Sequence, residues 1–250
     1  MKNPSVSVIT PCFNADKYIS SCLESVQNQT FQDWEHIVID DNSKDDSSGI
    51  IKDYADKDPR ILFKSIQHNT GTAAGRNSAI TASRGRYIAF LDADDLWLPE
   101  KLEVQLGLMK QHAWAFTFSD YAIINQEGVT VRDRVGIPSY VEYEDLLKNT
   151  VIGCLTVVID SHKIHDLVMP ALRSGQDYAL WYRILRSGFV ANGIERVLAK
   201  YRIVPGSLSR NKIYAARRMW RLYREYENIN VLRSSWYFMN YAYNSFKRRF

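Results

Sequence analysis

The segment Tyr87-Ile88-Ala89-Phe90-Leu91-Asp92-Ala93-Asp94-Asp95 is an apolar run that ends in three aspartates. A short apolar run predicts a buried β-strand. If the strand continues to residue 94, Asp92 and Asp94 face the same side of it, because strand side chains alternate. Two adjacent carboxylates repel each other unless a cation joins them, and Mg²⁺ or Mn²⁺ binds carboxylates together with phosphate oxygens. The pair therefore indicates a metal site, with capping of the next helix as the alternative for both and as our expectation for Asp95.

The residues before this strand repeat one pattern, in which a short apolar run is followed by apolar residues at helical spacing. The predicted strands are 6–10, 36–39, 61–66 and 87–91, and the predicted helices lie near 18–26, 50–54 and 72–83, with a fourth from about Pro99. Gly85 is expected to end the third helix. This alternation predicts an α/β fold with a mostly parallel central sheet and helices on both faces.

The pattern is looser after about residue 113. It predicts strands at 116–121, 155–159 and 197–204 and a helix at 178–185, and the sequence Pro-Gly-Ser-Leu-Ser at 205–209 indicates a break. We therefore expect one domain over residues 1–211, in two halves that meet near 112, followed by a helical extension over 212–250.

The extension has its own composition. It contains nine of the 32 Lys and Arg residues, two Glu and eleven of the 31 aromatic residues. One helical stripe comprises Ile213, Ala216, Trp220 and Tyr223, and a second comprises Leu232, Trp236, Met239, Tyr243 and Phe246. Two interpretations stay open: a helical hairpin packed on the domain, or an anchor whose apolar face enters the headgroup region of an anionic membrane.

Overall composition limits the function classes. The 250 residues are 46% hydrophobic and 24% charged, which suits one sizeable core, and the net charge of +4 does not indicate nucleic-acid binding. Cys12, Cys22 and Cys154 are too few and too scattered for a disulfide framework, so a reducing compartment is expected. No apolar run approaches the roughly 20 residues of a membrane span, and no signal segment is evident. We expect a cytoplasmic protein, with peripheral membrane attachment as a further possibility.

Polar clusters follow all four predicted strands of the first half. They are Thr10-Pro11-Cys12-Phe13-Asn14, Asp40-Asp41-Asn42-Ser43, His68-Asn69-Thr70-Gly71 and Asp92-Ala93-Asp94-Asp95. Ligands of parallel sheets bind at the carboxyl ends of the strands, so these clusters predict one shared pocket. The segment 69–77, with Gly71, Gly75 and Arg76 at the start of a helix, suits a phosphate. Asp177 precedes another helical pattern, as an N-cap or as an acceptor of a proton from an attacking hydroxyl.

In this order and spacing, the motifs resemble family 2 glycosyltransferases of the GT-A fold, of the kind that build bacterial surface polysaccharides. The resemblance covers about residues 5–210. It rests on the segments 6–14, 38–43, 69–77 and 91–95 and on Gln176-Asp177. It implies a nucleotide-sugar-binding half at about 1–112 and an acceptor-binding half at 113–211.

The resemblance also implies residue roles. Pro11 and Phe13 would line the nucleotide pocket. Asp41, with Asp40 as the second choice, would accept a hydrogen bond from the base, which points to uracil and a UDP-sugar. The remaining implied positions are Asn69 and Arg76 near the nucleotide or diphosphate, Asp92 at the ribose or sugar, Asp94 at a Mn²⁺ or Mg²⁺ ion, and Asp177 as the catalytic base.

Two positions depart from the family pattern. Val204 stands where relatives often carry a histidine near the diphosphate, and Gln176 stands where many carry a glutamate. Arg202, Ser207, Ser209 or Arg210 could contact the diphosphate instead, unless their loop is an inert part of the surface.

The implied function is an inverting, metal-dependent transfer of one sugar from a UDP-sugar to a glycan, lipid-linked in our expectation, at a membrane that the basic extension contacts. The alternative is a catalytically silent nucleotide-sugar-binding or scaffold protein of the same fold.

Overall fold

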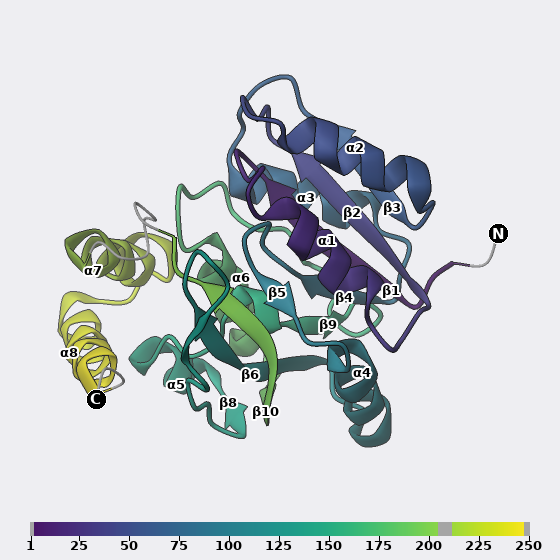
Figure 1. Ribbon diagram of the computed structural model, residues 1–250. Coiled ribbons are helices and arrows are strands. Elements are labelled where there is room, and N and C mark those ends of the chain that lie inside the picture. The colour runs from purple at the N-terminus through teal and green to yellow at the C-terminus, as the bar shows by residue number, and fades with distance from the viewer. Residues whose placement is uncertain (1–2, 205–211, 248–250) are drawn as a thin grey trace.

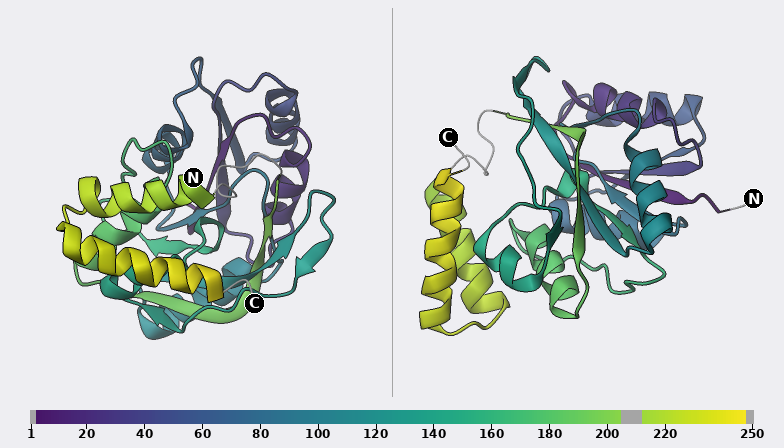
Figure 2. Two further views of the ribbon diagram at one scale, coloured as in Figure 1. Left: turned by 90° about the vertical axis from the view of Figure 1, so that its left-hand side faces the viewer. Right: turned by 90° about the horizontal axis from the view of Figure 1, so that it is seen from below.

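A computed structural model describes residues 3–204 and 212–247. The loop expected at 205–209, with Ser207, Ser209 and Arg210, lies outside the described residues. The described strands form one mixed sheet in the order β3-β2-β1-β4-β9-β6-β10-β5, with β7 beside β6 and β8 beside β10. Helices cover both faces of this sheet, and two further helices lie side by side at one end of the molecule (Figures 1 and 2). The predicted α/β architecture is confirmed.

The first half alternates strands and helices as the sequence predicts. Its elements are β1 (Val6–Cys12), α1 (Ile19–Gln27), β2 (Trp34–Asp40), α2 (Ser47–Lys57), β3 (Ile61–Ser65), α3 (Thr72–Ala82) and β4 (Tyr87–Phe90). The four strands are mutually parallel in the order β3-β2-β1-β4. Because they are parallel, their carboxyl ends meet at one edge, which is the geometry that a shared pocket requires.

The second half contains more irregular elements. They are β5 (Leu96–Trp97), α4 (Lys101–His112), β6 (Phe116–Ile124), β7 (Thr130–Arg132), β8 (Tyr140–Val141), α5 (Tyr143–Lys148), the 3-10 turn η1 (Cys154–Thr156), β9 (Val158–Asp160), α6 (Gln176–Arg186) and β10 (Ala191–Arg202). β9 runs antiparallel to both β4 and β6, and so joins the two halves into one sheet. The strand expected at 155–159 is therefore a 3-10 turn followed by a short strand.

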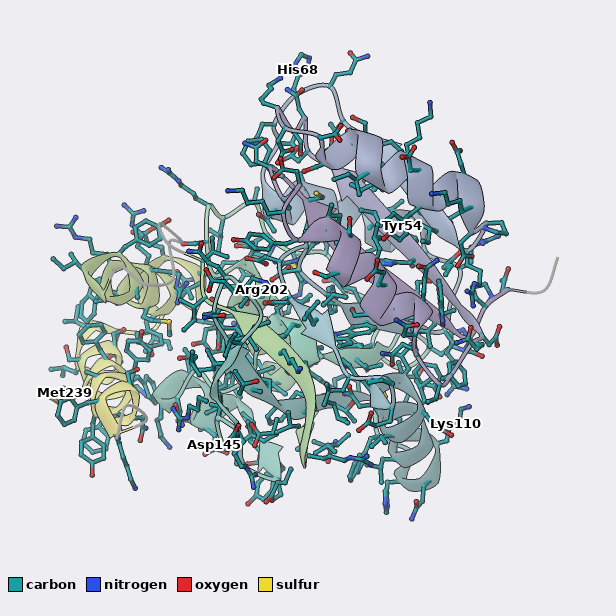
Figure 3. All side chains as sticks on the ribbon, in the orientation of Figure 1. Tyr54, His68, Lys110, Asp145, Arg202 and Met239 are labelled. Atoms are coloured by element: carbon teal, nitrogen blue, oxygen red, sulfur yellow. The ribbon has the colours of Figure 1, made fainter. Side chains whose placement is uncertain are left out.

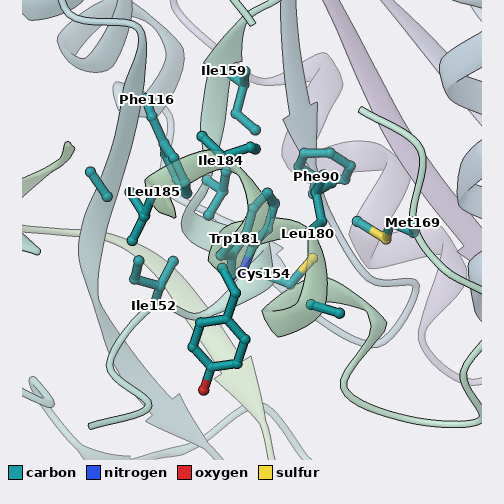
Figure 4. Packing of buried hydrophobic residues seen from close by; sticks show 14 of the residues in the cluster. Phe90, Phe116, Ile152, Cys154, Ile159, Met169, Leu180, Trp181, Ile184 and Leu185 are labelled. Carbon is teal, nitrogen blue, oxygen red and sulfur yellow. The ribbon is translucent and has the colours of Figure 1, made fainter. Parts of the chain in front are cut away.

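Buried side chains form one core on each face of the sheet. One core packs residues of α1, α2 and α4 against the sheet. The other contains residues of α3, α5 and α6, with Trp181 of α6 at its centre. The Trp181 ring centroid lies 5.6 Å from that of Phe90 and 5.1 Å from that of Phe116 (Figure 4). Fully buried aromatic pairs of this kind hold a helix firmly, so α6 has a defined position on the sheet.

The C-terminal extension is a helical hairpin. It consists of α7 (Lys212–Arg221), the π-helical turn η3 (Leu222–Tyr226) and α8 (Val231–Lys247). Met219, Leu222, Tyr223 and Tyr237 are buried and belong to the same core as α6. The Tyr223 hydroxyl donates a hydrogen bond to the Leu147 carbonyl at 2.6 Å. The hairpin is thus packed on the domain, as one of the two interpretations predicts.

Gly85 differs from its predicted role. α3 ends at Ala82 and the next residue is already extended, so Gly85 does not end the helix. A Cβ atom at Gly85 would lie 2.5 Å from the Ser7 nitrogen. The glycine instead lets the segment before β4 pass directly against the backbone of β1.

Candidate functional site

Hydrogen bonds tie together the segments that follow β1 and β2. The Ser43 hydroxyl accepts a hydrogen bond from the Asn14 N–H at 2.9 Å, and the Asn14 side-chain oxygen accepts one from the Lys44 N–H at 2.8 Å. Asn14 and Asn42 both adopt positive φ angles, which asparagine tolerates better than most residues. The loops after these two strands therefore form one continuous wall.

Asp41 connects the second strand end to the third. Its carboxylate accepts hydrogen bonds from the Thr70 N–H at 2.7 Å, the Thr70 hydroxyl at 3.0 Å and the Gly71 N–H at 2.7 Å. Asp40 is fully buried and accepts a hydrogen bond from the Ser48 hydroxyl at 2.7 Å. A carboxylate has about four lone-pair sites, so Asp41 retains capacity for one further donor. Contact with a nucleotide base stays a prediction for Asp41.

Arg76 connects the third strand end to the fourth. It lies in α3, is only 3% exposed, and forms an ion pair with Asp92. Burial lowers the pKa of the Arg76 guanidinium, but Asp92, Cys154 and Asp177 raise it, and the net pKa is above the ordinary value. The buried cation therefore holds the Asp92 carboxylate in place, and Asp177 is close enough to act on the same cation.

Asp94 and Asp95 have different surroundings. Burial and then the neighbouring Asp92 charge raise the pKa of Asp94 to about 6. Asp95 is fully buried and accepts a hydrogen bond from the Arg202 N–H at 2.8 Å. The predicted capping role of Asp95 is wrong, because α4 begins only at Lys101 and Glu100 is its N-cap. Asp95 instead joins β10 to the segment 92–95 that follows β4, which we call the aspartate turn.

Arg202 supports this turn from the other half of the sheet. Its Nε donates to the Asp94 carbonyl at 2.8 Å and its Nη1 donates to the Gln126 carbonyl at 2.8 Å. The guanidinium also lies 5.0 Å from the centre of the Tyr18 ring. Arg202 is only 5% exposed and central in the molecule (Figure 3). It therefore positions Asp94 and is not free to reach a diphosphate, which was one of its predicted roles.

The residues around Asp94 fit a divalent cation that takes one or two ligands from the protein and the others from phosphate oxygens and water. Within residues 3–204 and 212–247, no cluster of three His, Cys, Asp or Glu side chains could hold a metal ion by itself. Asp94 forms no ion pair with a described cation, and its raised pKa shows that its negative charge is poorly compensated. Mg²⁺ is commonly held by one or two carboxylates together with phosphate oxygens and water. Asp94, with Asp92 beside it, has this chemistry.

Asp177 lies in the first turn of α6. Gly175 is the N-cap of that helix, so the predicted alternative of an Asp177 cap is wrong. The positive end of a helix favours a carboxylate in the first turn. Trp181, one turn further along α6, packs against Phe90 of the sheet and so fixes the position of the helix. The charges of Asp92 and Asp177 both raise the pKa of Arg76. Among the described residues no hydrogen bond or ion pair joins Asp177 to Arg76, Asp92 or Asp94, so its place as the base stays a prediction.

Three other predicted residues lie around this centre. Pro11 is half-buried near the end of β1, and its Cβ lies 3.4 Å from where a Cβ at Gly75 would be, so the glycine lets α3 approach β1. Phe13 is 49% exposed at the end of β1. Asn69 is exposed and no hydrogen bond of its side chain is found within the described part of the chain. Their contacts with a nucleotide stay predictions.

Sequence reasoning missed Cys154 in this site. Burial raises the pKa of its thiol well above the ordinary value, and Arg76, Asp92 and Asp177 all act on it. Cys154 is therefore affected by the charges of three of the predicted site residues or their neighbours. No sequence signal identifies it, because it comes from the irregular turn η1 and has no motif around it.

The four parallel strands, the antiparallel β9 beside them and the helices on both faces form a GT-A-like fold. The sequence model of the family described as "Glycosyl transferase family 2" matches residues 7–158. The chain belongs to glycosyl transferase family 2, and it is a glycosyltransferase. The predicted family and fold are confirmed.

Named relatives cover nearly the whole chain. The putative teichuronic acid biosynthesis glycosyltransferase TuaG of Bacillus subtilis is 42% identical, over 98% of both chains. The UDP-Glc:alpha-D-GlcNAc-diphosphoundecaprenol beta-1,3-glucosyltransferase WfgD of Escherichia coli is 34% identical, over 97% of this chain and 94% of the relative.

Solved structures show the same fold at low identity. S. aureus TarS 1-349 in complex with UDP-GlcNAc has a TM-score of 0.72 at 18% identity, over 97% of this chain and 73% of that one. The Pyrobaculum calidifontis mannosyltransferase PcManGT, in complex with GDP-Man and Mn²⁺, has a TM-score of 0.72 at 15% identity, over 95% of this chain and 70% of that one.

Proposed function

We propose that this protein transfers one sugar from a UDP-sugar to a lipid-linked glycan in cell-surface polysaccharide synthesis, with inversion at the anomeric carbon and with a divalent cation. The observation that carries the proposal is the buried Arg76–Asp92 ion pair beside the Asp94 backbone that Arg202 holds. The charges of Asp92 and Asp177 support it, because both raise the pKa of Arg76. The named acceptor of WfgD, a sugar joined to a lipid through a diphosphate, supports the choice of acceptor class.

The choice of donor rests on two supports. Asp41 is 3% exposed and accepts three hydrogen bonds, and a carboxylate can accept about four, so one lone-pair site remains by this count. A uracil N–H can donate a hydrogen bond to such a site. Two relatives at 34% and 35% identity are named as enzymes that use UDP-Glc. UDP-Glc is therefore the first donor to test.

The proposed chemistry is a single displacement. The acceptor hydroxyl attacks the anomeric carbon as its proton passes to Asp177, the new C–O bond forms, and the bond to the diphosphate breaks and releases UDP. The sugar gains oxocarbenium character as this bond breaks. Attack opposite the leaving group inverts the anomeric centre, so no covalent enzyme intermediate forms.

The cation completes the donor site in this proposal. Asp94 would hold it with Asp92 alongside, and when bound it would offset the charge that grows on the leaving diphosphate. Arg202 donates a hydrogen bond to the Asp94 carbonyl, so the backbone that carries the Asp94 carboxylate has a defined position.

The hairpin supports attachment to a membrane surface. Leu232, Trp236, Met239, Tyr243 and Phe246 form one face of α8, and each is between 57% and 84% exposed. Figure 3 shows Met239 on the outer side of the hairpin. Among the described residues, no helix combines the length and hydropathy that a membrane crossing requires. We propose that this face, the α8 stripe, lies in the headgroup region, where aromatic side chains are favoured.

The test is to replace Asp177 with Asn and to measure transfer from UDP-Glc to GlcNAc linked through a diphosphate to a lipid. We expect the rate to fall by about 100- to 10,000-fold, the usual contribution of a general base. UDP affinity by calorimetry should not change. Product NMR on the wild type should show inversion.

The control is Asp133→Asn, which removes the same charge from an exposed position outside the site. It should keep wild-type activity. An Asp177→Asn variant with wild-type activity would exclude Asp177 as the base. A wild-type protein that binds UDP-sugars but transfers none of them would favour the silent binding protein.

A further inference from the structure

A cavity of about 350 Å³ lies between α7 and the segment that leads into α6. Its wall includes one face of α7, where Tyr214, Arg217, Arg218 and Arg221 recur at helical spacing, and Leu222 at the start of η3. Leu172, Arg173 and Ser174 form the opposite side, and Glu225 and Tyr226 close one end. Four arginines against one glutamate make this an electropositive cavity.

These arginines have no anionic partner in the described structure. None of Arg173, Arg217, Arg218 and Arg221 forms an ion pair with an acid among residues 3–204 and 212–247, whereas other arginines do, such as Arg76, Arg86 and Arg186. The Nε of Arg218 is buried and has no hydrogen-bond acceptor. A buried donor without an acceptor is costly, so the cavity suits an anion that enters it from outside.

The cavity adjoins the proposed catalytic base. The Arg218 Cδ lies 3.1 Å from where a Cβ at Gly175 would be, so the arginine side chain rests on the N-cap of α6. Asp177 follows two residues later. Ser174 donates a hydrogen bond to the Tyr214 hydroxyl at 3.0 Å and so joins the two walls. An anion in the cavity therefore lies on the acceptor side of the site.

An apolar groove continues from the cavity along the hairpin. Arg217, Arg221 and Glu225 line both spaces, and Trp220, Ala216 and Phe238 line the groove. The Trp220 and Phe238 rings meet edge to face at 6.0 Å between centroids. An electropositive cavity that opens into an aromatic groove matches a ligand with an anionic head and a hydrocarbon chain.

We infer that the cavity binds the diphosphate of a lipid-linked acceptor and that the groove takes the first part of its hydrocarbon chain. This inference rests on the proposed function. Arginines bind phosphate oxygens through paired N–H groups. A diphosphate held beside Gly175 would set how far the acceptor sugar reaches toward Asp177. Acceptors without the diphosphate would then bind weakly, whichever sugar they carry.

The test measures binding of farnesyl diphosphate to the full chain by calorimetry, with UDP at saturating concentration so that the donor site is filled. Arg218→Gln removes the half-buried guanidinium whose Nε is buried. The double variant Arg217→Gln/Arg221→Gln changes only exposed residues, in case the first variant folds poorly. Arg233→Gln is the matched control, because Arg233 is on the same hairpin, does not line the cavity, and contacts Glu144 at 3.5 Å and the Tyr237 hydroxyl at 3.3 Å. Melting curves check folding.

We expect Arg218→Gln and the double variant to weaken farnesyl diphosphate binding by a factor of about ten or more, which is the loss of one charge-assisted contact. Arg233→Gln should bind as the wild type does, and farnesol should bind far more weakly than farnesyl diphosphate. The KM for the lipid-linked acceptor should rise in the two cavity variants, with UDP affinity unchanged.

Two results would overturn the inference. In the first, the cavity variants bind farnesyl diphosphate no more weakly than Arg233→Gln does, or farnesol binds as tightly as its diphosphate. In the second, the cavity variants lose binding to vesicles of phosphatidylcholine and phosphatidylglycerol beyond the loss in Arg233→Gln but keep farnesyl diphosphate affinity, so that the cavity takes a lipid headgroup. Failure of UDP binding or of transfer in the wild type would instead count against the proposed function, independently of the cavity.

Discussion

Asp92 and Asp94 are two residues apart, but their carboxylates have different charged partners. Arg76 forms an ion pair with Asp92, whereas the carboxylate of Asp94 has no such partner among the described residues. Burial and then the Asp92 charge raise the pKa of Asp94 to about 6. A carboxylate in this state gains most from a bound cation. The site thus distinguishes a positioning carboxylate from a proposed metal ligand by the placement of one arginine.

Replacing Asp94 with Asn should remove the effect of Mn²⁺ on UDP binding. In the wild type we expect Mn²⁺ to tighten UDP binding, because the cation joins Asp94 to the diphosphate. In the variant the affinities with and without Mn²⁺ should be the same, as measured by calorimetry. Asp133→Asn should behave as the wild type. An Asp94→Asn variant that still responds fully to Mn²⁺ would refute the metal assignment.

At the scale of elements, the site depends on close contacts between backbone segments. The segment that leads into β4 passes β1 at Gly85, and β4 carries the aspartate turn at its end. A shift of β4 relative to β1 would move Asp92 and Asp94 together, away from the loops after the other strands. The glycine therefore contributes to the geometry of the site without touching a ligand.

Gly85→Ala should destabilise the protein. The added methyl would lie 2.5 Å from the Ser7 nitrogen, which is backbone and cannot rotate away. Forced overpacking of this kind costs about 1–3 kcal/mol of unfolding free energy. Gly107→Ala is the control, because Gly107 is an exposed residue of α4 with nothing within 4 Å of the added atom. That variant should gain about 0.5–1 kcal/mol. Urea unfolding measures both, and equal stabilities would contradict the prediction.

At the scale of the whole molecule, the hairpin presents two different faces. Met219, Tyr223 and Tyr237 are buried against the domain, while the α8 stripe faces outward. An exposed apolar face of this length is unusual on a protein surface and indicates an interaction. The two interpretations of the extension are thus compatible, because the buried and the exposed side chains lie on different faces of the same hairpin.

The double variant Trp236→Ser/Met239→Ser should weaken binding to anionic vesicles without loss of fold. Both side chains are more than half exposed, so little core packing is lost. Apolar burial in the headgroup region drives such binding, and we expect at least a tenfold fall in a sedimentation assay, about 1.4 kcal/mol. Val129→Ser/Val131→Ser removes exposed apolar side chains from the β7 region and should have no effect. Equal loss in both variants, or none, would contradict membrane attachment by the α8 stripe.

The division of the chain at residue 211 and the nucleotide contacts of Pro11, Phe13 and Asn69 stay predictions. The α/β architecture followed from the sequence, because buried parallel strands are continuous apolar runs and the polar residues after them mark one sheet edge. The GT-A fold and the family followed from the resemblance of those polar motifs, in order and spacing, to family 2 glycosyltransferases. These signals are local in the chain and need no knowledge of the packing.

Only the tertiary structure decided which partner each of these residues has. Asp95 accepts a hydrogen bond from the backbone of β10, and Arg202 donates one to the carbonyl of Asp94 in the aspartate turn. Arg76 forms an ion pair with Asp92, sixteen residues further along the chain. On α8, which carries apolar residues on more than one side, the helical period did not tell which side faces the core; packing against α5 buries Tyr237 and leaves Trp236 outside. The physical reason is that such choices depend on contacts between segments far apart in the chain, whereas strand, helix and turn preferences depend on neighbours.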